Sequence, residues 1–185
     1  MKRFVRVPAF ALLLAAVLSA TAARGEDSGK WISLFNGKDL SGWTFHLDNP
    51  KAKMSDVWSV KDGVLSCKGN PRGYIRTKDD YENYVLKLQW RFDPEKGPGN
   101  SGVLLRMVGE HKVWPKSIEA QLQSRNAGDI WNIDKVQMTV APDRTEGRRT
   151  IKLHETNEKP LGEWNEYEIT ADHGTITLKV NGLVQ

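Results

Sequence analysis

Apolar and polar residues alternate with a period of two along most of the chain, and turn residues separate the alternating segments. Residues 57–60 and 64–67 flank Lys61-Asp62-Gly63, and an Asp-Gly pair between two such segments predicts a β-hairpin. The same alternation predicts strands at residues 84–92, 101–107, 118–123, 166–170 and 175–180. No window shows the period of an amphipathic helix. Many short strands at this spacing predict an all-β fold, an antiparallel sandwich or jelly roll.

A second hairpin signal lies at the end of the sequence. The strand predicted at residues 175–180 runs into Asn181-Gly182, and only Leu183, Val184 and Gln185 follow. An arm this short would leave its partner strand with an unpaired edge. We therefore expect the sequence to be a C-terminally truncated fragment that lacks its last strands.

The polar faces of the strands carry the side chains best suited to bind a ligand. In residues 118–123, apolar positions alternate with Glu119, Gln121 and Gln123, a carboxylate and two amides that hydrogen-bond hydroxyl groups well. Gln89, Arg91, Arg106 and Glu168 occupy the polar faces of other predicted strands. Two interpretations stay open: these side chains line one polar groove, or they are ordinary outward-facing residues of antiparallel sheets.

The N-terminal residues have the pattern of a secretory signal peptide. Lys2, Arg3 and Arg6 precede an apolar run at 9–20, and small residues follow it. We expect cleavage between Ala22 and Glu26, with a signal peptide at 1–25, a single domain at 26–185 and a periplasmic or secreted protein. The run is short for a membrane span, so we expect none after cleavage, although a membrane anchor is the alternative reading.

Removal of the signal peptide changes the charge balance. The whole chain has 27 basic and 23 acidic residues, a net charge of +4, and all four charged residues of 1–25 are basic, so the rest is neutral. A neutral chain gives no support for nucleic-acid binding. Cys67 is the only cysteine, so the fold cannot rest on an internal disulfide.

Histidine and tryptophan supply further candidates. The four histidines are scattered without zinc-type spacing, so the sequence predicts no cofactor, and it gives no indication for or against a divalent metal requirement. His154 is either a second candidate base or a loop histidine satisfied by its neighbours. Trp131 is predicted in a polar loop beside the Glu119 strand, where an indole either stacks on a sugar ring or packs locally.

Glycosidases of sandwich fold commonly use two carboxylates, a nucleophile and an acid/base. The segment around Glu119 has one carboxylate, because amides occupy the positions two and four residues later. An amide neither attacks nor transfers a proton as a carboxyl does. Conventional hydrolysis therefore requires that Glu168 or Asp129 lie beside Glu119.

Several segments, in order along the chain, together resemble the bacterial 3-keto-disaccharide (3-keto-glucoside) hydrolase family. They are W-I-S-L-F-N-G-K-D-L-S-G-W at 31–43, N-S-G-V-L-L-R at 100–106, E-A-Q-L-Q at 119–123, N-E-K-P-L-G-E-W-N-E-Y-E-I at 157–169 and V-N-G at 180–182. The resemblance implies a concanavalin-like jelly roll, usually exported, that cleaves glycosides oxidised at C3 of the sugar. Family members usually continue past V-N-G with two further strands, in agreement with the expected truncation.

The resemblance also fits a single carboxylate. A ketone at C3 acidifies the C2 hydrogen, so one base can remove it, and the enolate then expels the group at C1. Glu119 would be the base, with His154 as the next candidate, and Arg106 would stabilise the enolate oxygen. The expected substrate-binding residues are Gln89, Arg91, Asn100, Gln121, Gln123 and Trp131.

Three other readings of the function stay open. The domain could be a non-catalytic, lectin-like carbohydrate-binding module, a conventional glycosidase of concanavalin-like fold, or a structural interaction domain of the cell envelope. Turnover of a 3-keto-glucoside separates the enzyme from the binding module.

Overall fold

A computed structural model describes residues 30–185, and the chain divides into Met1–Ile32 and Ser33–Gln185. The signal peptide predicted at 1–25 lies outside the described residues, so cleavage and export stay predictions. Within the described part, no helix has the length and apolarity needed to cross a bilayer. The fold described below is that of Ser33–Gln185.

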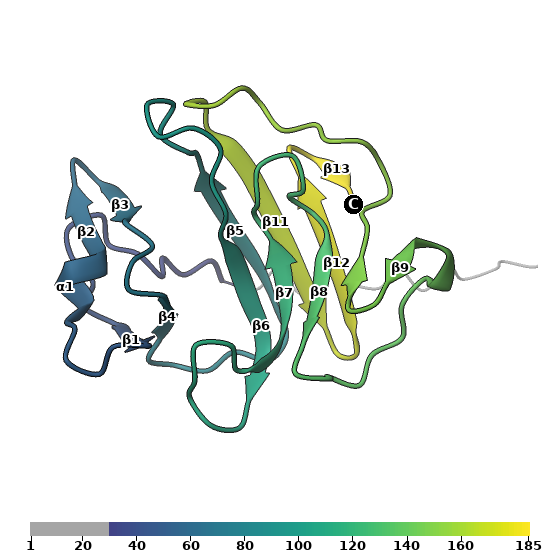
Figure 1. Ribbon diagram of the computed structural model, residues 1–185, viewed down its shortest axis with the longest axis horizontal. Coiled ribbons are helices and arrows are strands. Elements are labelled where there is room, and N and C mark those ends of the chain that lie inside the picture. Colours follow the sequence, from purple (N-terminus) through teal and green to yellow (C-terminus); the bar gives the residue numbers. More distant parts are fainter. Residues whose placement is uncertain (1–29) are drawn as a thin grey trace, which may run out of the picture. The chain divides into compact units, whose positions relative to one another are not determined.

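Two antiparallel sheets account for most of the strands (Figure 1). The five-stranded sheet has the order β6-β7-β8-β10-β9: β6 Gly102–Val108, β7 Lys116–Gln121, β8 Ile130–Ile133, β10 Arg149–Thr150 and β9 Thr145–Glu146. The four-stranded sheet has the order β13-β12-β11-β5: β13 Leu183–Val184, β12 Thr175–Val180, β11 Asn165–Asp172 and β5 Tyr84–Trp90.

The two sheets bury one hydrophobic core between them. Leu105, Ile118 and Ala120 of the five-stranded sheet meet Tyr167 and Ile169 of the four-stranded sheet, and all five side chains are buried. Period-two alternation produces this core, because every second residue of β7 and β11 points to the same side. The predicted all-β sandwich is confirmed.

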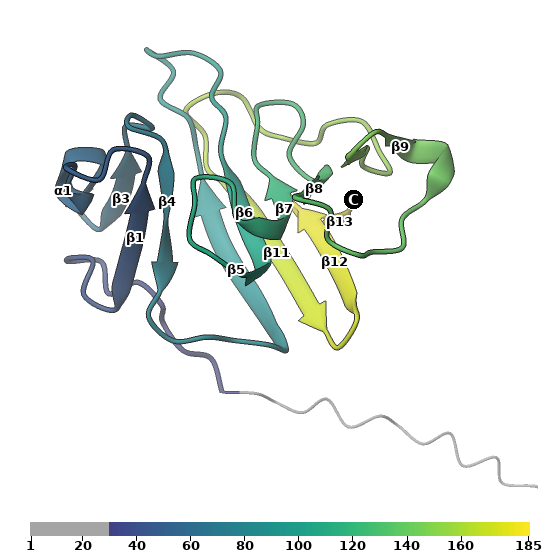
Figure 2. The ribbon, with the colours of Figure 1, turned by 60° about the horizontal axis from the view of Figure 1, so that its bottom comes forward.

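A smaller part of the fold has its own core. β1 Trp43–Leu47 pairs with β4 Gly73–Thr77, and the two strands lie side by side in Figure 2. The short helix α1 Met54–Val57 leads into β2 Trp58–Lys61, which pairs with β3 Val64–Cys67, and a 3₁₀ turn, η1 Pro142–Arg144, precedes β9. Leu47, Val57 and Trp58 are buried together.

The helix α1 corrects one prediction, since residue 57 belongs to the helix and the strand begins at Trp58. Asp56 supports the helix start because its carboxylate accepts the Lys53 N–H at 2.8 Å. Four residues are too few to display a helical period, so alternation alone could not reveal the helix.

Both predicted hairpins form. The turn residues Asp62 and Gly63 have φ values of 50° and 76°, and Asn181 and Gly182 have 47° and 82°. Positive φ at both central residues is the geometry of the type I′ turn that Asp-Gly and Asn-Gly favour. The second turn pairs β12 with β13.

Candidate functional site

The face of β7 opposite the core carries the candidate site. Glu119 pairs in register with Leu104 of β6 and with Trp131 of β8, so these three side chains share one face. Gln121 lies two residues after Glu119 on the same face, and Arg149 of β10 pairs with Trp131. The outer surface of the five-stranded sheet formed by Leu104, Glu119, Gln121, Asp129, Trp131 and Arg149 is called the Glu119 face below.

Glu119 is buried, although its strand was predicted to have one wet face. The exposed fraction of Glu119 is 8%, the same as that of core-facing Ile118, so β7 is covered on both faces. The missing side chain of Gly102 makes room for the carboxylate, since a Cβ at that position would lie 2.2 Å from Glu119 Oε1. A glycine inside a strand often marks such a close approach.

The Glu119 carboxylate has no hydrogen-bond or ion-pair partner among the described residues. Both carboxylate oxygens remain accessible to solvent, because neither is among the fully buried side-chain atoms that lack a hydrogen-bond partner in the described residues. Burial raises the pKa of Glu119, and the positive charge of Arg148 opposes that increase without cancelling it. The outcome is a half-desolvated, unpaired carboxyl group, which suits proton transfer.

Arg148 is the cation whose charge reaches Glu119. Its guanidinium carbon lies 5.1 Å from the ring centroid of Trp131, and that of Arg149 lies 6.0 Å away. Trp131 lies in strand β8, whereas the sequence predicts a loop position. Its ring makes a cation–π contact with Arg148. Stacking of Trp131 on a sugar ring stays a prediction.

A second carboxylate, Asp129, lies on the same face but is fully engaged. The residue is 0% exposed, and Oδ2 accepts from Arg149 Nε at 2.8 Å and lies 2.6 Å from Nη2. Oδ1 accepts the backbone N–H of Lys152 at 3.0 Å. Because both oxygens are occupied, Asp129 has a structural role here and Glu119 is the unpaired carboxylate of the face.

The side-chain oxygens of the two amides after Glu119 already accept hydrogen bonds from other groups of the protein. Gln121 Oε1 accepts the N–H groups of Leu122 and Gln123 at 2.9 and 3.0 Å, which ends the strand and leaves only its NH₂ group for a ligand. Gln123 lies beyond the end of β7, and its Oε1 accepts from Asn126 at 3.2 Å. The predicted row of three polar side chains thus reduces to Glu119 and one amide nitrogen.

Arg106 does not lie with Glu119. The β6–β7 register shifts between Leu105 and Val108, and Arg106 has a φ of 53° at this irregularity. Its guanidinium donates to the carbonyl of His173 at 2.6 Å and lies 4.0 Å from Glu82. The bulge directs the side chain toward the β11–β12 turn, so the predicted pairing of Arg106 with Glu119 on one face is wrong.

Gln89 and Glu168 lie on the four-stranded sheet and Arg91 directly follows its strand β5, so of the two interpretations left open the single groove is wrong. Gln89 donates to Glu166 at 3.2 Å, and Arg91 stacks 4.7 Å from the ring centroid of Trp164. Glu168 lies between two lysines, 3.2 Å from Lys87 and 2.8 Å from Lys179. Strand β5, which carries Gln89 and directly precedes Arg91, pairs with β11 rather than with β6. These ion pairs and contacts are those of an ordinary outer sheet face.

The last two sequence candidates are exposed loop residues. Asn100 precedes Ser101, whose carbonyl accepts the N–H of Leu122 at 2.8 Å, so Asn100 lies near the end of β7. His154 follows Leu153, whose N–H donates to the carbonyl of Gln185 at 3.4 Å. No contact among the described residues joins either side chain to Glu119.

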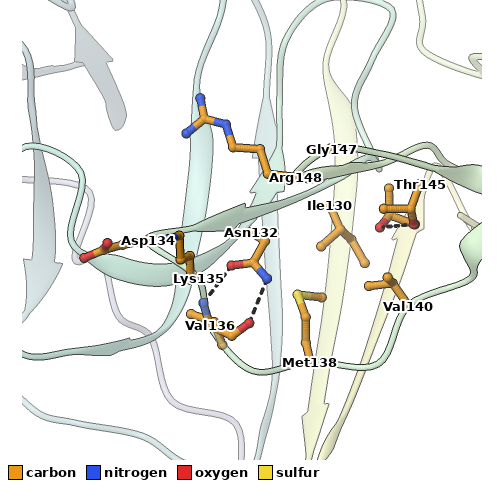
Figure 3. Close-up of a pocket in the computed structure, with 11 residues that line it drawn as sticks. Ile130, Asn132, Asp134, Lys135, Val136, Met138, Val140, Thr145, Gly147 and Arg148 are labelled. Atoms are coloured by element: carbon orange, nitrogen blue, oxygen red, sulfur yellow. Dashed lines mark hydrogen bonds between the residues drawn. The ribbon is translucent and has the colours of Figure 1, made fainter.

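A cavity of about 510 Å³ lies on the core side of β8 (Figure 3). Ile130 and Met138 supply apolar lining, and Asn132 holds the cavity wall by accepting from Val136 N and donating to Val136 O, each at 2.7 Å. Arg148 also lines the cavity, but in Figure 3 its side chain extends away from Met138. Within residues 30–185, no group of three or more histidine, cysteine or acidic side chains could hold a metal ion.

The fold and the site define a β-sandwich protein with one unpaired acid–base group on a sheet face. The chain belongs to the 3-keto-alpha-glucoside-1,2-lyase-like domain family, whose sequence model matches residues 30–185. No curated protein matched the chain. Family membership and the structural neighbours described next support a glycosidase-like function.

Two similar solved structures are Parabacteroides distasonis proteins described as candidate glycosyl hydrolases. One is 28% identical with a TM-score of 0.57, and the match covers 84% of this chain and 70% of that protein. The other is 26% identical with a TM-score of 0.52, and the match covers 82% of this chain and 68% of that protein.

Proposed function

We propose that the protein cleaves the glycosidic bond of 3-keto-glucosides or 3-keto-disaccharides, with Glu119 as the catalytic base. The observation that carries this proposal is the unpaired, buried carboxylate of Glu119 beside Asp129, a carboxylate whose two oxygens are already occupied. One available carboxylate suits elimination from a keto-sugar better than double displacement, which needs two. Family membership supports the substrate class.

The reaction begins with transfer of the C2 proton of the sugar to a carboxylate oxygen of Glu119. The electron pair of the C2–H bond forms an enolate with the C3 carbonyl. The C1–O bond then breaks, and the departing oxygen takes up the proton held by Glu119, which releases the second group as an alcohol or sugar and restores the carboxylate. Water adds at C1 and a proton returns to C2, so the net reaction is hydrolysis. The raised pKa of Glu119 makes its ionised form a stronger base.

Arg148 takes the role that the sequence had assigned to Arg106. Its charge acts on Glu119, and its exposed guanidinium has hydrogen-bond donors available for an enolate oxygen. The contact with Trp131 restricts the orientation of the guanidinium before substrate binds. The free amide nitrogen of Gln121 is then placed to donate to a sugar hydroxyl.

The presence of Asp129 on the Glu119 face favours a conventional glycosidase as the second candidate. Asp129, directly before the paired strand β8, is a diagonal neighbour of Glu119, and a pair of carboxylates is what a conventional glycosidase requires. Against this candidate, Asp129 would have to leave both Arg149 and the Lys152 N–H to act as a base.

Incubation of the purified protein with a 3-keto-glucoside and with the matching unoxidised glucoside tests the proposal. We expect release of the aglycone from the keto-sugar only, and a decrease of roughly 10²–10⁴-fold in kcat for Glu119→Gln. Cleavage of the unoxidised glucoside would instead support the conventional glycosidase. Binding of both sugars without cleavage would support a carbohydrate-binding module.

A further inference from the structure

Three aromatic rings from distant parts of the chain meet on the β1–β4 ribbon. His46 of β1 and Tyr74 of β4 are direct cross-strand partners, with ring centroids 5.8 Å apart and planes inclined by 24°. His111, in the loop between β6 and β7, adds a third ring 6.4 Å from His46 and 6.2 Å from Tyr74. These three residues are called the ring cluster below.

The ring cluster lies on the face of the ribbon that does not pack into the small core. Leu47 and Ile75, the neighbours of His46 and Tyr74 along the chain, point to the opposite face and pack with Trp58. His111 is exposed, and His46 and Tyr74 are half-buried. The rings are therefore accessible, which is unusual for an aromatic cluster whose role is only to fill a core.

A hydrogen bond fixes the rings before any ligand binds. The Tyr74 hydroxyl and His111 Nδ1 are 2.6 Å apart, and this bond joins the β6–β7 loop to the ribbon. No hydrogen bond within the described part of the chain uses the ring nitrogens of His46 or Nε2 of His111. The ring plane of His46 is inclined by 24° to that of Tyr74 and by 25° to that of His111, whereas the planes of Tyr74 and His111 are inclined by 41°. The cluster thus combines exposed aromatic surfaces with free polar atoms at their edges, the two features that bind a sugar ring.

Two connections place the ring cluster at one end of strands β7 and β8, which carry Glu119 and Trp131. The loop that carries His111 leads directly into β7, and its Lys112 forms an ion pair of 2.7 Å with Asp134, which follows β8. From Lys116, the first residue of β7, the strand covers roughly 10 Å to Glu119 at about 3.4 Å per residue. The loop is therefore held at the same end of the two strands that carry Glu119 and Trp131.

We propose that the ring cluster is a carbohydrate subsite that stacks against the pyranose ring linked to the cleaved sugar. The choice of a glycoside as the ligand rests on the proposed function, but binding to the cluster does not depend on turnover. A subsite at that end of β7 would distinguish disaccharides from glucosides with a small aglycone. Because the rings are pre-oriented, little rotamer entropy would be lost on binding.

Binding of sugars that cannot react tests this subsite. The probes are an unoxidised glucose disaccharide and methyl glucoside, titrated by calorimetry into the full chain, its Tyr74→Ala and His111→Ala variants, and the control Tyr81→Ala. Tyr81 is an exposed tyrosine outside the cluster. We expect the disaccharide to bind the wild type more tightly, and both cluster variants to bind it roughly 3- to 10-fold more weakly, the range of one aromatic contact. Methyl glucoside binding and the control should not change.

Wild-type disaccharide affinity in His111→Ala would overturn the subsite, and so would equal affinity of the wild type for the two probes. Since His111 is exposed, its variant stays informative even if Tyr74→Ala unfolds. The same titration of Glu119→Gln separates the two proposals. If Glu119→Gln binds the disaccharide with normal affinity but does not cleave a 3-keto-glucoside, both the subsite and the proposed reaction are supported. If the wild type fails to cleave keto-sugars but binds the disaccharide through the cluster, only the proposed reaction is wrong.

Discussion

Substitution of Gly102 by alanine should move the Glu119 carboxylate, while its charge and the pairing of strand β7 remain unchanged. A Cβ at residue 102 would lie 2.2 Å from Glu119 Oε1, 2.7 Å from Cγ and 2.8 Å from Cδ. Ordinary contacts begin at 3.4 Å, so the carboxylate must retreat by more than 1 Å. The atoms it meets belong to a side chain rather than to the backbone, so the side chain can move while the fold persists.

A shift of this size should reduce turnover strongly. Misplacement of a reacting group by about 1 Å can cost about 10²-fold, and we expect that decrease in kcat/KM of Gly102→Ala for a 3-keto-glucoside. The assay is release of the aglycone, with near-UV circular dichroism to verify the tertiary structure. Gly174→Ala is the matched control, because a Cβ there would meet nothing within 4 Å and the backbone φ is ordinary.

The refuting result is a folded Gly102→Ala variant whose kcat/KM remains within about threefold of the wild type, since placement of the base should affect the rate steeply. Such a result would mean that the base is not Glu119 at this position. An equal loss in Gly174→Ala would show that the decrease reflects a general effect of alanine rather than a displaced carboxylate.

Two further predictions concern the ionisation of Glu119. Arg148→Ala should move the acid limb of the kcat/KM pH profile to higher pH, because Arg148 lowers the pKa of Glu119. Arg106→Ala should leave that limb in place, because Arg106 bonds to His173 instead. The reverse pattern would mean that Arg106, and not Arg148, is the cation that acts on Glu119. Glu119→Gln should be more stable than the wild type at alkaline pH. Because the pKa of Glu119 is raised in the folded protein, ionisation of the buried carboxyl group above that pKa lowers the free energy of unfolding of the wild type, and glutamine does not ionise. Urea unfolding should show the two proteins converging below the ordinary carboxyl pKa of 4.5, and a variant less stable at every pH would contradict the buried, unpaired state of Glu119.

Local sequence signals predicted the local features of the fold. The alternation predicted the ends of β5, β6, β11 and β12 to within two residues, and the Asp-Gly and Asn-Gly pairs predicted the positions of both hairpin turns. These features depend on neighbours in sequence, which is why the sequence alone reveals them. The strands β1 and β4 were missed, although His46 and Tyr74 of the ring cluster belong to them.

The candidate site depended on contacts between distant residues. Gln89 pairs with Glu166 rather than with a residue of β6, and no local pattern indicates which sheet a strand joins. Arg106 does not lie on the Glu119 face, because strand β6 is irregular at this point and Arg106 has a positive φ, which a non-glycine residue rarely adopts. Gly102 was the available signal for the buried carboxylate, since a glycine within a strand indicates close approach of another group.

Cleavage of a 3-keto-glucoside in D₂O tests the central claim most directly. Removal of the C2 proton by Glu119, followed by return of a solvent proton, predicts one deuterium at C2 of the released keto-sugar. Mass spectrometry at short times, corrected for exchange without enzyme, should detect it with the wild type and should detect neither product nor label with Glu119→Gln. A product released by the wild type without deuterium, or a labelled product released at the wild-type rate by Glu119→Gln, would contradict the account.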